Sequence, residues 1–234
     1  LSDASKIYNL VCQHRANSFI LQYKASQSIG CFETDIIFDK EKTISAHSKE
    51  LNTNLVFDKF LKSDYQKNTV WIDAKNIKKT NNCLTALNWL KKYHSKFKSV
   101  LLEIPTISIE SVVDKKWLDC IDEINLIDNV EVAYYVDTHL SRKCSSDIKS
   151  KNLTSKNCEN LYKSLDTISK STSLKSITFD YDAAFESISN KKSLENFKWH
   201  IWNINDPQVF SEIVKKNNIG IILLKNNKNL SNLN

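Results

Sequence analysis

Short apolar runs alternate along this chain with longer segments in which apolar residues recur at a helical period. We predict strands wherever such a run of strand length is flanked by polar turn residues. The predicted strands cover 8–14, 31–38, 69–75, 99–104, 130–136, 176–181, 198–204 and 219–224. The predicted helices cover 17–29, 55–61, 84–97, 109–124, 158–169, 183–188 and 207–216. Because nearly every strand is followed by a helix, the pattern indicates a parallel sheet, and eight such units indicate a closed (β/α)₈ TIM barrel.

Two further segments complete the prediction. Residues 43–47 are expected to be a short extended piece, and the polar stretch 141–156 is expected to be the longest loop. We find no composition shift or repeat that would indicate a domain boundary. The sequence therefore predicts one barrel domain that spans residues 1–234.

The composition supports a large core and excludes several kinds of partner. Hydrophobic residues make up 41% of the chain and aromatic residues 10%, which argues against disorder. The net charge is +6, but the Lys residues are scattered among Asn and Ser and form no basic stripe with interleaved aromatic residues. We therefore expect no nucleic-acid partner. No apolar run approaches the roughly 18–20 residues that a transmembrane helix needs, so we expect none.

The six Cys residues contain no CxxC spacing and no Cys/His cluster, which disfavours structural zinc. Their even number permits disulfides, and Cys144 with Cys158 is the pair we expect first, since they flank the polar loop. Free thiols are the alternative. The chain begins at Leu1 and contains no Met, which is consistent with the removal of a leader. These features favour a location outside the cytoplasm, whereas the oligomeric state is left open.

The predicted strand 31–38 carries two acidic residues, Glu33 and Asp35. Residues two apart on a strand share a face, so the two carboxylates lie side by side while Thr34 points the other way. Such a pair in a buried strand is costly, because the charges repel each other and lose water. A cation between them would offset that cost. We therefore predict a divalent metal ion at this strand.

Other titratable residues lie at the ends of neighbouring predicted strands. They are His14, Arg15, His47, Asp73 and Lys75. TIM-barrel enzymes carry their catalytic groups at the C-terminal ends of strands, so we expect these side chains to meet at one mouth of the barrel. Taken singly, each has an ordinary structural explanation as a packed imidazole, a solvated strand face or a salt bridge. The ordered set is what predicts a site.

This set resembles the glycerophosphodiester phosphodiesterase family, which belongs to the phospholipase C-like group of TIM-barrel phosphodiesterases. The matching motifs are His14-Arg15, Glu33-Thr34-Asp35, Ala46-His47, Ile72-Asp73-Ala74-Lys75 and Trp202-Asn203-Ile204-Asn205. They follow the family's order: His-Arg after strand one, Glu-x-Asp on strand two, a later His, a carboxylate-x-Lys on strand three, and a Trp-x-x-Asn element on strand seven. The resemblance covers most of the chain.

The chain departs from the family in several places. Ala16 stands where the family usually has Gly, Ser48 follows His47 in place of Asp, and the third carboxylate is Asp73 where Glu is usual. The connection from His47 to the next strand is also short. The Asp-x-Lys pair and this short connection are similar to the sphingomyelinase D-type phospholipases of the same superfamily.

The resemblance implies a set of roles. Glu33, Asp35 and Asp73 would hold one divalent cation, Mg²⁺ or Ca²⁺, because both prefer hard oxygen ligands. His14 and His47 would be the acid/base pair, since imidazole titrates near neutral pH. Substrate contacts would come from Arg15, Lys75 and Trp202, of which the first two bind phosphate or carboxylates and the third packs on the alcohol.

The activity expected from this resemblance is hydrolysis of glycerophosphodiesters, the deacylated forms of phospholipid headgroups. The partner would then be a small phosphodiester or a phospholipid headgroup. One alternative is a sphingomyelinase D-type phospholipase that acts on intact lipid, which an apolar rim beside the site would favour. A second alternative is a catalytically silent barrel used for binding, in which metal and His14 are dispensable.

Overall fold

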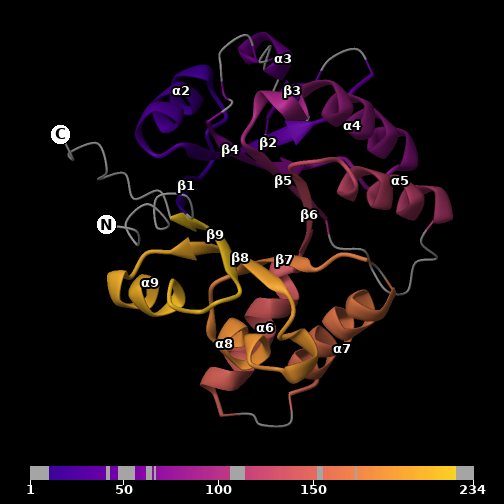
Figure 1. Ribbon diagram of the computed structural model, residues 1–234. Helices are drawn as coiled ribbons and strands as arrows, with labels where there is room; N and C mark the ends of the chain where they lie inside the picture. Colours follow the sequence, from indigo (N-terminus) through magenta and orange to yellow (C-terminus); the bar gives the residue numbers. More distant parts are fainter. Residues whose placement is uncertain are drawn as a thin grey trace.

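The computed structural model confirms the TIM barrel (Figure 1). It describes residues 11–40, 43–46, 56–61, 65, 67–105, 114–151, 155–171 and 173–224. The parallel strands are β1 (Val11–Gln13), β2 (Cys31–Ile37), β4 (Thr69–Ala74), β5 (Ser99–Ile104), β6 (Val130–Tyr135), β7 (Ser176–Asp180), β8 (Lys198–Ile204) and β9 (Ile219–Leu224). They correspond to the eight predicted strands, within the part of the chain that is described.

The strands follow one another around the barrel in chain order, each parallel to its neighbour. β1 closes the barrel because it pairs with β9 on one side and with β2 on the other. The short extended piece predicted after β2 is β3 (Ile44–Ser45), which pairs antiparallel with β2 outside the barrel. All eight strands therefore end at the same mouth.

Helices surround the strands, and their bounds agree with most of the predicted segments (Figure 1). They are α2 (Phe19–Ser28), α3 (Phe57–Phe60), α4 (Thr80–Tyr93), α5 (Lys115–Asn125), α6 (Thr138–Lys149), α7 (Lys156–Ser171), α8 (Ala183–Ser189) and α9 (Pro207–Ile213), with 3₁₀ turns η1 (His94–Lys96) and η2 (Lys192–Leu194). Asp206 caps α9 ahead of Pro207, since its carboxylate accepts from the Gln208 amide. Among the described residues, no helix is long and apolar enough to cross a lipid bilayer.

One predicted loop is wrong. Much of the polar stretch 141–156 is helical, because α6 runs from Thr138 to Lys149 and α7 begins at Lys156. The buried positions of α6 are Ser141, Cys144 and Ser145, which keep a helical spacing but carry no large apolar side chain. The apolar residues that α6 packs against the core, Leu140 and Ile148, are only partly buried, and the helix as a whole is polar, so the sequence alone predicts a loop there.

Alternation along the strands divides the core into an outer and an inner part. Outward residues such as Phe32, Val70 and Ile177 pack beneath the helices in two large hydrophobic clusters. Inward residues form a small cluster inside the barrel that includes Trp71 and Leu101. Above this inner cluster, most strands present a polar or aromatic residue toward the C-terminal mouth, whereas β9 presents Leu223.

The described structure contains three disulfides, and no Cys is free. Cys144–Cys158 joins α6 to α7 and confirms the predicted pair, and Cys83–Cys120 joins α4 to α5. The third, Cys12–Cys31, lies inside the barrel between β1 and β2. The Cα atoms are 4.5–6.3 Å apart in the three pairs, within the range that disulfides span.

A polar network lies at the opposite, N-terminal end of the barrel. The ring of His200 is buried there, its Nδ1 accepts from the Ile221 amide at 2.9 Å, and its Nε2 lies 3.0 Å from Glu131. Glu131 also accepts from Lys198 at 2.8 Å and from Ser176. Burial raises the pKa of Glu131, but these hydrogen bonds and the charge of His200 more than offset it and hold the pKa well below its usual range.

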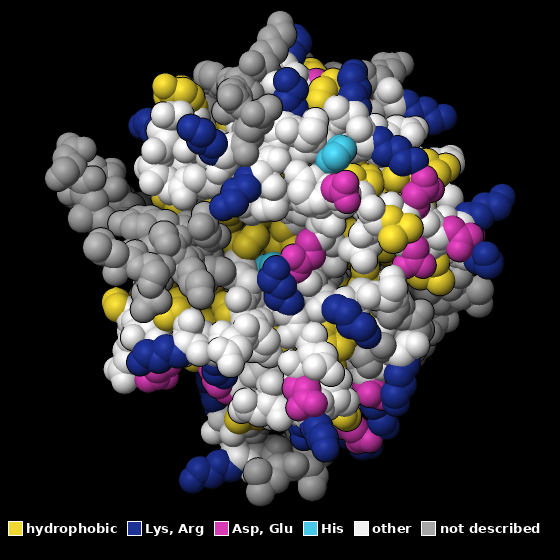
Figure 2. Space-filling view, in the orientation of Figure 1, with side chains coloured by type: hydrophobic (Ala, Val, Ile, Leu, Met, Phe, Trp, Pro, Cys, Tyr) yellow, Lys and Arg dark blue, Asp and Glu magenta, His cyan; other side chains and the backbone are white. Residues whose placement is uncertain are grey.

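The surface charge agrees with the sequence. On the face drawn in Figure 2, Lys and Arg side chains are scattered among acidic and neutral ones and are not gathered in a stripe.

Candidate active site

Three carboxylates converge at the C-terminal mouth of the barrel. Glu33 and Asp35 point inward from β2, and Asp73 of β4 is in register with Asp35. Each of the three offers an oxygen atom, and these atoms all lie within 4.8 Å of one another. The strand alternation and the parallel register that the sequence implied are what bring them together.

Glu33 is buried, with 3% of its surface exposed. His14, in the turn after β1, places Nε2 at 3.8 Å from the Glu33 carboxylate. Arg15 has a positive φ of 56°, and its amide donates to the same carboxylate at 2.5 Å. Burial and the charge of Asp35 raise the pKa of Glu33 to about 8, against the Arg15 hydrogen bond, which lowers it.

Asp35 is fixed by two neighbours. The side-chain NH₂ group of Asn17 donates to the Asp35 carboxylate at 2.5 Å, while the side-chain oxygen of Asn17 accepts from the Asp35 backbone N–H at 2.8 Å. On the other side, Lys75 places Nζ at 2.7 Å from Asp35 and also contacts Asp73. Burial alone would lower the pKa of Lys75, but the charges of Asp73 and Asp35 raise it above its ordinary value.

A fourth carboxyl extends the acidic row. Glu103 of β5 is in register with Asp73 and is 6% exposed. Burial, and after it the charge of Asp73, raise the pKa of Glu103 well above its ordinary value.

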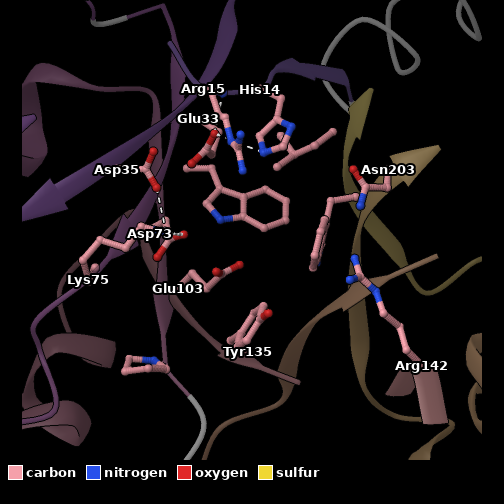
Figure 3. Close-up of a pocket in the computed structure, with 15 residues that line it drawn as sticks. His14, Arg15, Glu33, Asp35, Asp73, Lys75, Glu103, Tyr135, Arg142 and Asn203 are labelled. Atoms are coloured by element: carbon pink, nitrogen blue, oxygen red, sulfur yellow. Dashed lines mark hydrogen bonds and ion pairs between the residues drawn. The ribbon is translucent and has the colours of Figure 1, made fainter. Parts of the chain in front are cut away.

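The opposite wall of the mouth carries a cation and two aromatic rings. Arg142 of α6 donates to Asp180 at 3.2 Å, and Asn203 of β8 donates to the other Asp180 oxygen at 2.9 Å. Trp202 stacks on Tyr135, with ring centroids 6.2 Å apart. Figure 3 shows Arg142 and Asn203 facing the acidic cluster from across the mouth.

These walls enclose a cavity of about 450 Å³. That volume is in the range of sites for small ligands. His14, Arg15, Lys75 and Trp202 line it, as the sequence predicted, together with the three carboxylates. His47, the second predicted histidine, lies outside the described residues.

Several residues of the site were missed by the sequence analysis. Arg142 lies on the helix that was predicted as a loop, and Asn203 faces the cavity because its backbone has a positive φ of 66°. Asn17 acts through Asp35, and Trp71 forms the floor beneath the carboxylates. Only Asn203 had a sequence signal, since it lies within the Trp-x-x-Asn element.

The three carboxylates fit a hard divalent cation. They supply only oxygen ligands, two of them are buried, and the pKa of Glu33 is raised first by burial and then by the charge of Asp35. Mg²⁺ and Ca²⁺ both prefer carboxylate oxygens, and both complete their shells with water or phosphate.

Comparison with known proteins supports the fold. No family model and no curated protein matches the chain. The solved structures that the chain resembles include a glycerophosphodiester phosphodiesterase from Parabacteroides distasonis, with TM-score 0.54, 12% identity and 92% of each chain covered. They also include a phosphodiesterase from Oleispira antarctica in complex with the product sn-glycerol-3-phosphate, with TM-score 0.50, 13% identity and 94% of each chain covered. The chain thus has the barrel fold of these phosphodiesterases, over almost its whole length.

Proposed function

We propose that this protein is a metal-dependent phosphodiester hydrolase that cleaves glycerophosphodiesters. The observation that carries the proposal is the meeting of Glu33, Asp35 and Asp73 with His14 at one mouth of the barrel. The fold shared with a glycerophosphodiester phosphodiesterase supports it, as does the sn-glycerol-3-phosphate bound as product to the similar phosphodiesterase.

The acidic cluster would hold one Mg²⁺ or Ca²⁺. When bound, the cation neutralises phosphate charge and stabilises the negative charge that develops during hydrolysis. Arg15 and Lys75 line the same side of the cavity and would orient the phosphate, Arg15 through its planar guanidinium. Trp202, stacked on Tyr135, offers the alcohol portion of the substrate a flat apolar surface.

His14 and His47 would transfer the protons. One imidazole takes a proton from the attacking water, and the other gives a proton to the leaving alkoxide, so a phosphodiester and water yield a phosphomonoester and an alcohol. The contact of His14 with Glu33 keeps its imidazole at the edge of the cluster, where the phosphate would bind.

A hydrolysis assay over a panel of phosphodiesters tests the proposal. We expect turnover of glycerophosphodiesters with Mg²⁺ or Ca²⁺, loss of turnover with a chelator, and loss in the Glu33→Ala and His14→Ala variants. Gln208→Ala is a matched surface control that should keep wild-type rates. Absence of turnover across the panel, with the fold intact by circular dichroism, would favour the catalytically silent barrel.

One observation favours a second candidate, cleavage of intact phospholipid. Helix α2 begins four residues after Arg15 and carries three exposed apolar side chains, Ile20, Leu21 and Tyr23, which are 64%, 42% and 51% exposed. Such a group beside the mouth suits contact with a lipid surface. Turnover of phospholipid vesicles in preference to soluble glycerophosphocholine, reduced in Ile20→Ser, would establish this candidate over the first.

We also propose a location outside the cytoplasm. Three disulfides use all six Cys residues, and disulfides persist mainly in oxidising compartments. Thiol counting on the protein isolated from its source without reductant tests this, and six free thiols would contradict it.

A further inference from the structure

The disulfide Cys12–Cys31 differs from the other two in its place in the fold. Both residues are 1% exposed and pack inside the barrel with Trp71 and Leu101. The other two disulfides join helices outside the barrel. Only this pair, among the described disulfides, links two barrel strands.

The strands that it links share a short seam. β1 is three residues long, and its described pairing with β2 is the single position Gln13↔Phe32. By contrast, β2 pairs with β4 over six positions. Few backbone hydrogen bonds therefore fix the position of β1 along β2, and the disulfide adds a covalent link at this seam.

The candidate catalytic groups lie directly above this link. Residues two apart on a strand share a face and are separated by about 7 Å. Cys12 therefore lies directly beneath His14, and Cys31 lies directly beneath Glu33. The His14 Nε2 lies 3.8 Å from the Glu33 carboxylate. The Arg15 amide donates to that carboxylate at 2.5 Å, and the Ala16 amide donates to the Glu33 carbonyl at 2.8 Å.

We propose that Cys12–Cys31 is a positioning pair that fixes β1 against β2 and thereby holds the His14 imidazole at Glu33. The effect on turnover rests on the proposed function, whereas the effect on the seam does not. A displacement of about 1 Å in a catalytic group can reduce the rate about 100-fold, so a covalent link two residues below both groups has a direct consequence for chemistry.

The chain supplies a matched control for the test. Cys83 and Cys120 are also buried, at 0% and 2% exposed, so C83A/C120A removes the same atoms as C12A/C31A from an equally buried place. Native-state hydrogen exchange is measured at the Arg15 and Ala16 amides, which report the seam, and at the Tyr181 amide, which donates to Trp202 on the far side of the barrel.

In C12A/C31A we expect exchange at Arg15 and Ala16 to accelerate at least about tenfold while Tyr181 keeps its protection. We expect kcat to fall about 100-fold with KM changed less than about threefold, because the displaced group acts on the reacting phosphate. C83A/C120A should leave the two seam amides and kcat at wild-type values. Unchanged seam protection in C12A/C31A, or an equal loss in C83A/C120A, overturns the proposal.

If C12A/C31A does not fold, the single variant C12A, which keeps the Cys31 side chain in the interior, is measured in the same way and judged by the same two outcomes. If the wild-type protein hydrolyses no phosphodiester, the proposed function fails. The amide exchange then decides the positioning proposal by itself.

Discussion

The ammonium group of Lys75 lies 2.7 Å from the Asp35 carboxylate and also contacts Asp73. Lys75 is thus the counter-charge for two of the three clustered acids, in the absence of metal. Its raised pKa keeps it charged throughout the physiological range. This pairing makes the stability of the metal-free protein and its affinity for a cation depend on the same few groups.

Replacing Lys75 by Met should therefore destabilise the metal-free protein. Asp35 would remain buried without its cation, and because Lys75 is partly exposed we expect the free energy of unfolding to fall by about 1–3 kcal/mol. Added Mg²⁺ or Ca²⁺ should restore more stability to the variant than to wild type. Urea unfolding with a chelator and then with metal measures both effects.

The matched control is Lys91→Met, which removes an ion pair with Glu123 in which both side chains are 51% exposed. We expect a change of less than about 1 kcal/mol there, because exposed pairs contribute little. An equal effect in the two variants would contradict the counter-charge role of Lys75.

Metal binding should release a proton from Glu33. Its pKa of about 8 means that the metal-free protein holds a proton there at pH 7, whereas a metal ligand must be ionised. Affinity for Mg²⁺ or Ca²⁺ should rise by up to about tenfold per pH unit from pH 6 to 8 and then level off. Calorimetry at pH 7 in two buffers of different ionisation enthalpy counts the proton. A pH-independent affinity would contradict this assignment.

The raised pKa of Glu33 also affects the stability of the metal-free protein, which should fall as the pH rises, whereas metal affinity rises. A group whose pKa is raised by folding stabilises the protein below its unfolded pKa, here about 4.5, and that contribution is lost as the pH rises through about 8. Glu33→Gln should remove this loss. The free energy of unfolding in chelator, measured between pH 5 and 8, separates the variant from wild type.

The barrel and its carboxylates could be predicted because they depend on local pattern. Apolar runs of strand length gave the strands, and the alternation of side chains together with a shared mouth placed Glu33, Asp35 and Asp73 together. Arg142 could not be predicted in this way. Its helix buries small residues such as Ser141, and its partner Asp180 lies 38 residues away along the chain.

Loss of the Asp180 carboxylate should change substrate binding more than chemistry. Asp180 orients both Arg142 and Asn203 on the wall opposite the metal ligands, so Asp180→Asn should raise KM about tenfold and change kcat less than about threefold. Arg142→Gln should raise KM similarly. Steady-state kinetics on the best substrate of the panel measures both variants.

The double variant D180N/R142Q decides whether the two residues act together, since a shared role predicts that its KM is no higher than that of either single variant. Asp166→Asn, which removes an ion pair with Lys170 outside the cavity, should leave both constants unchanged. If the KM increases of the two single variants multiplied in the double variant, the two residues would act independently, which would contradict the role given to Asp180. A decrease confined to kcat would contradict it as well.

Stability should fall in acid because of His200. Both ring nitrogens are engaged in the neutral form, with Ile221 and Glu131. Burial lowers the pKa of His200 below its ordinary value despite the opposing charge of Glu131. A His whose pKa is lowered by folding stabilises the protein above its unfolded pKa of about 6.5, and this contribution is lost at up to about 1.4 kcal/mol per unit as the pH falls toward the folded value.

His200→Gln should flatten this part of the pH profile, measured as the free energy of unfolding between pH 8 and 5. His94→Gln is the matched control, because His94 is only partly buried and contacts Asn129 at the surface. The control should keep the wild-type slope. A wild-type slope in His200→Gln would assign the acid sensitivity to other groups.

The same ring explains why residue 220 is Gly. A Cβ atom at this position would lie 2.5 Å from Cε1 and 2.7 Å from Nδ1 of His200, closer than real Cβ contacts allow. The ring cannot move away without breaking its bonds to Ile221 and Glu131. Gly220→Ala should therefore lower the free energy of unfolding by about 1–3 kcal/mol, the usual cost of overpacking a core.

A double-mutant cycle with His200→Ala tests that explanation, since removing the ring removes the clash. In the His200→Ala background, Gly220→Ala should cost less than about 0.5 kcal/mol, measured by urea unfolding at pH 8 where His200 is neutral. A cost that is the same in both backgrounds would mean that the backbone at residue 220, and not the ring of His200, requires glycine.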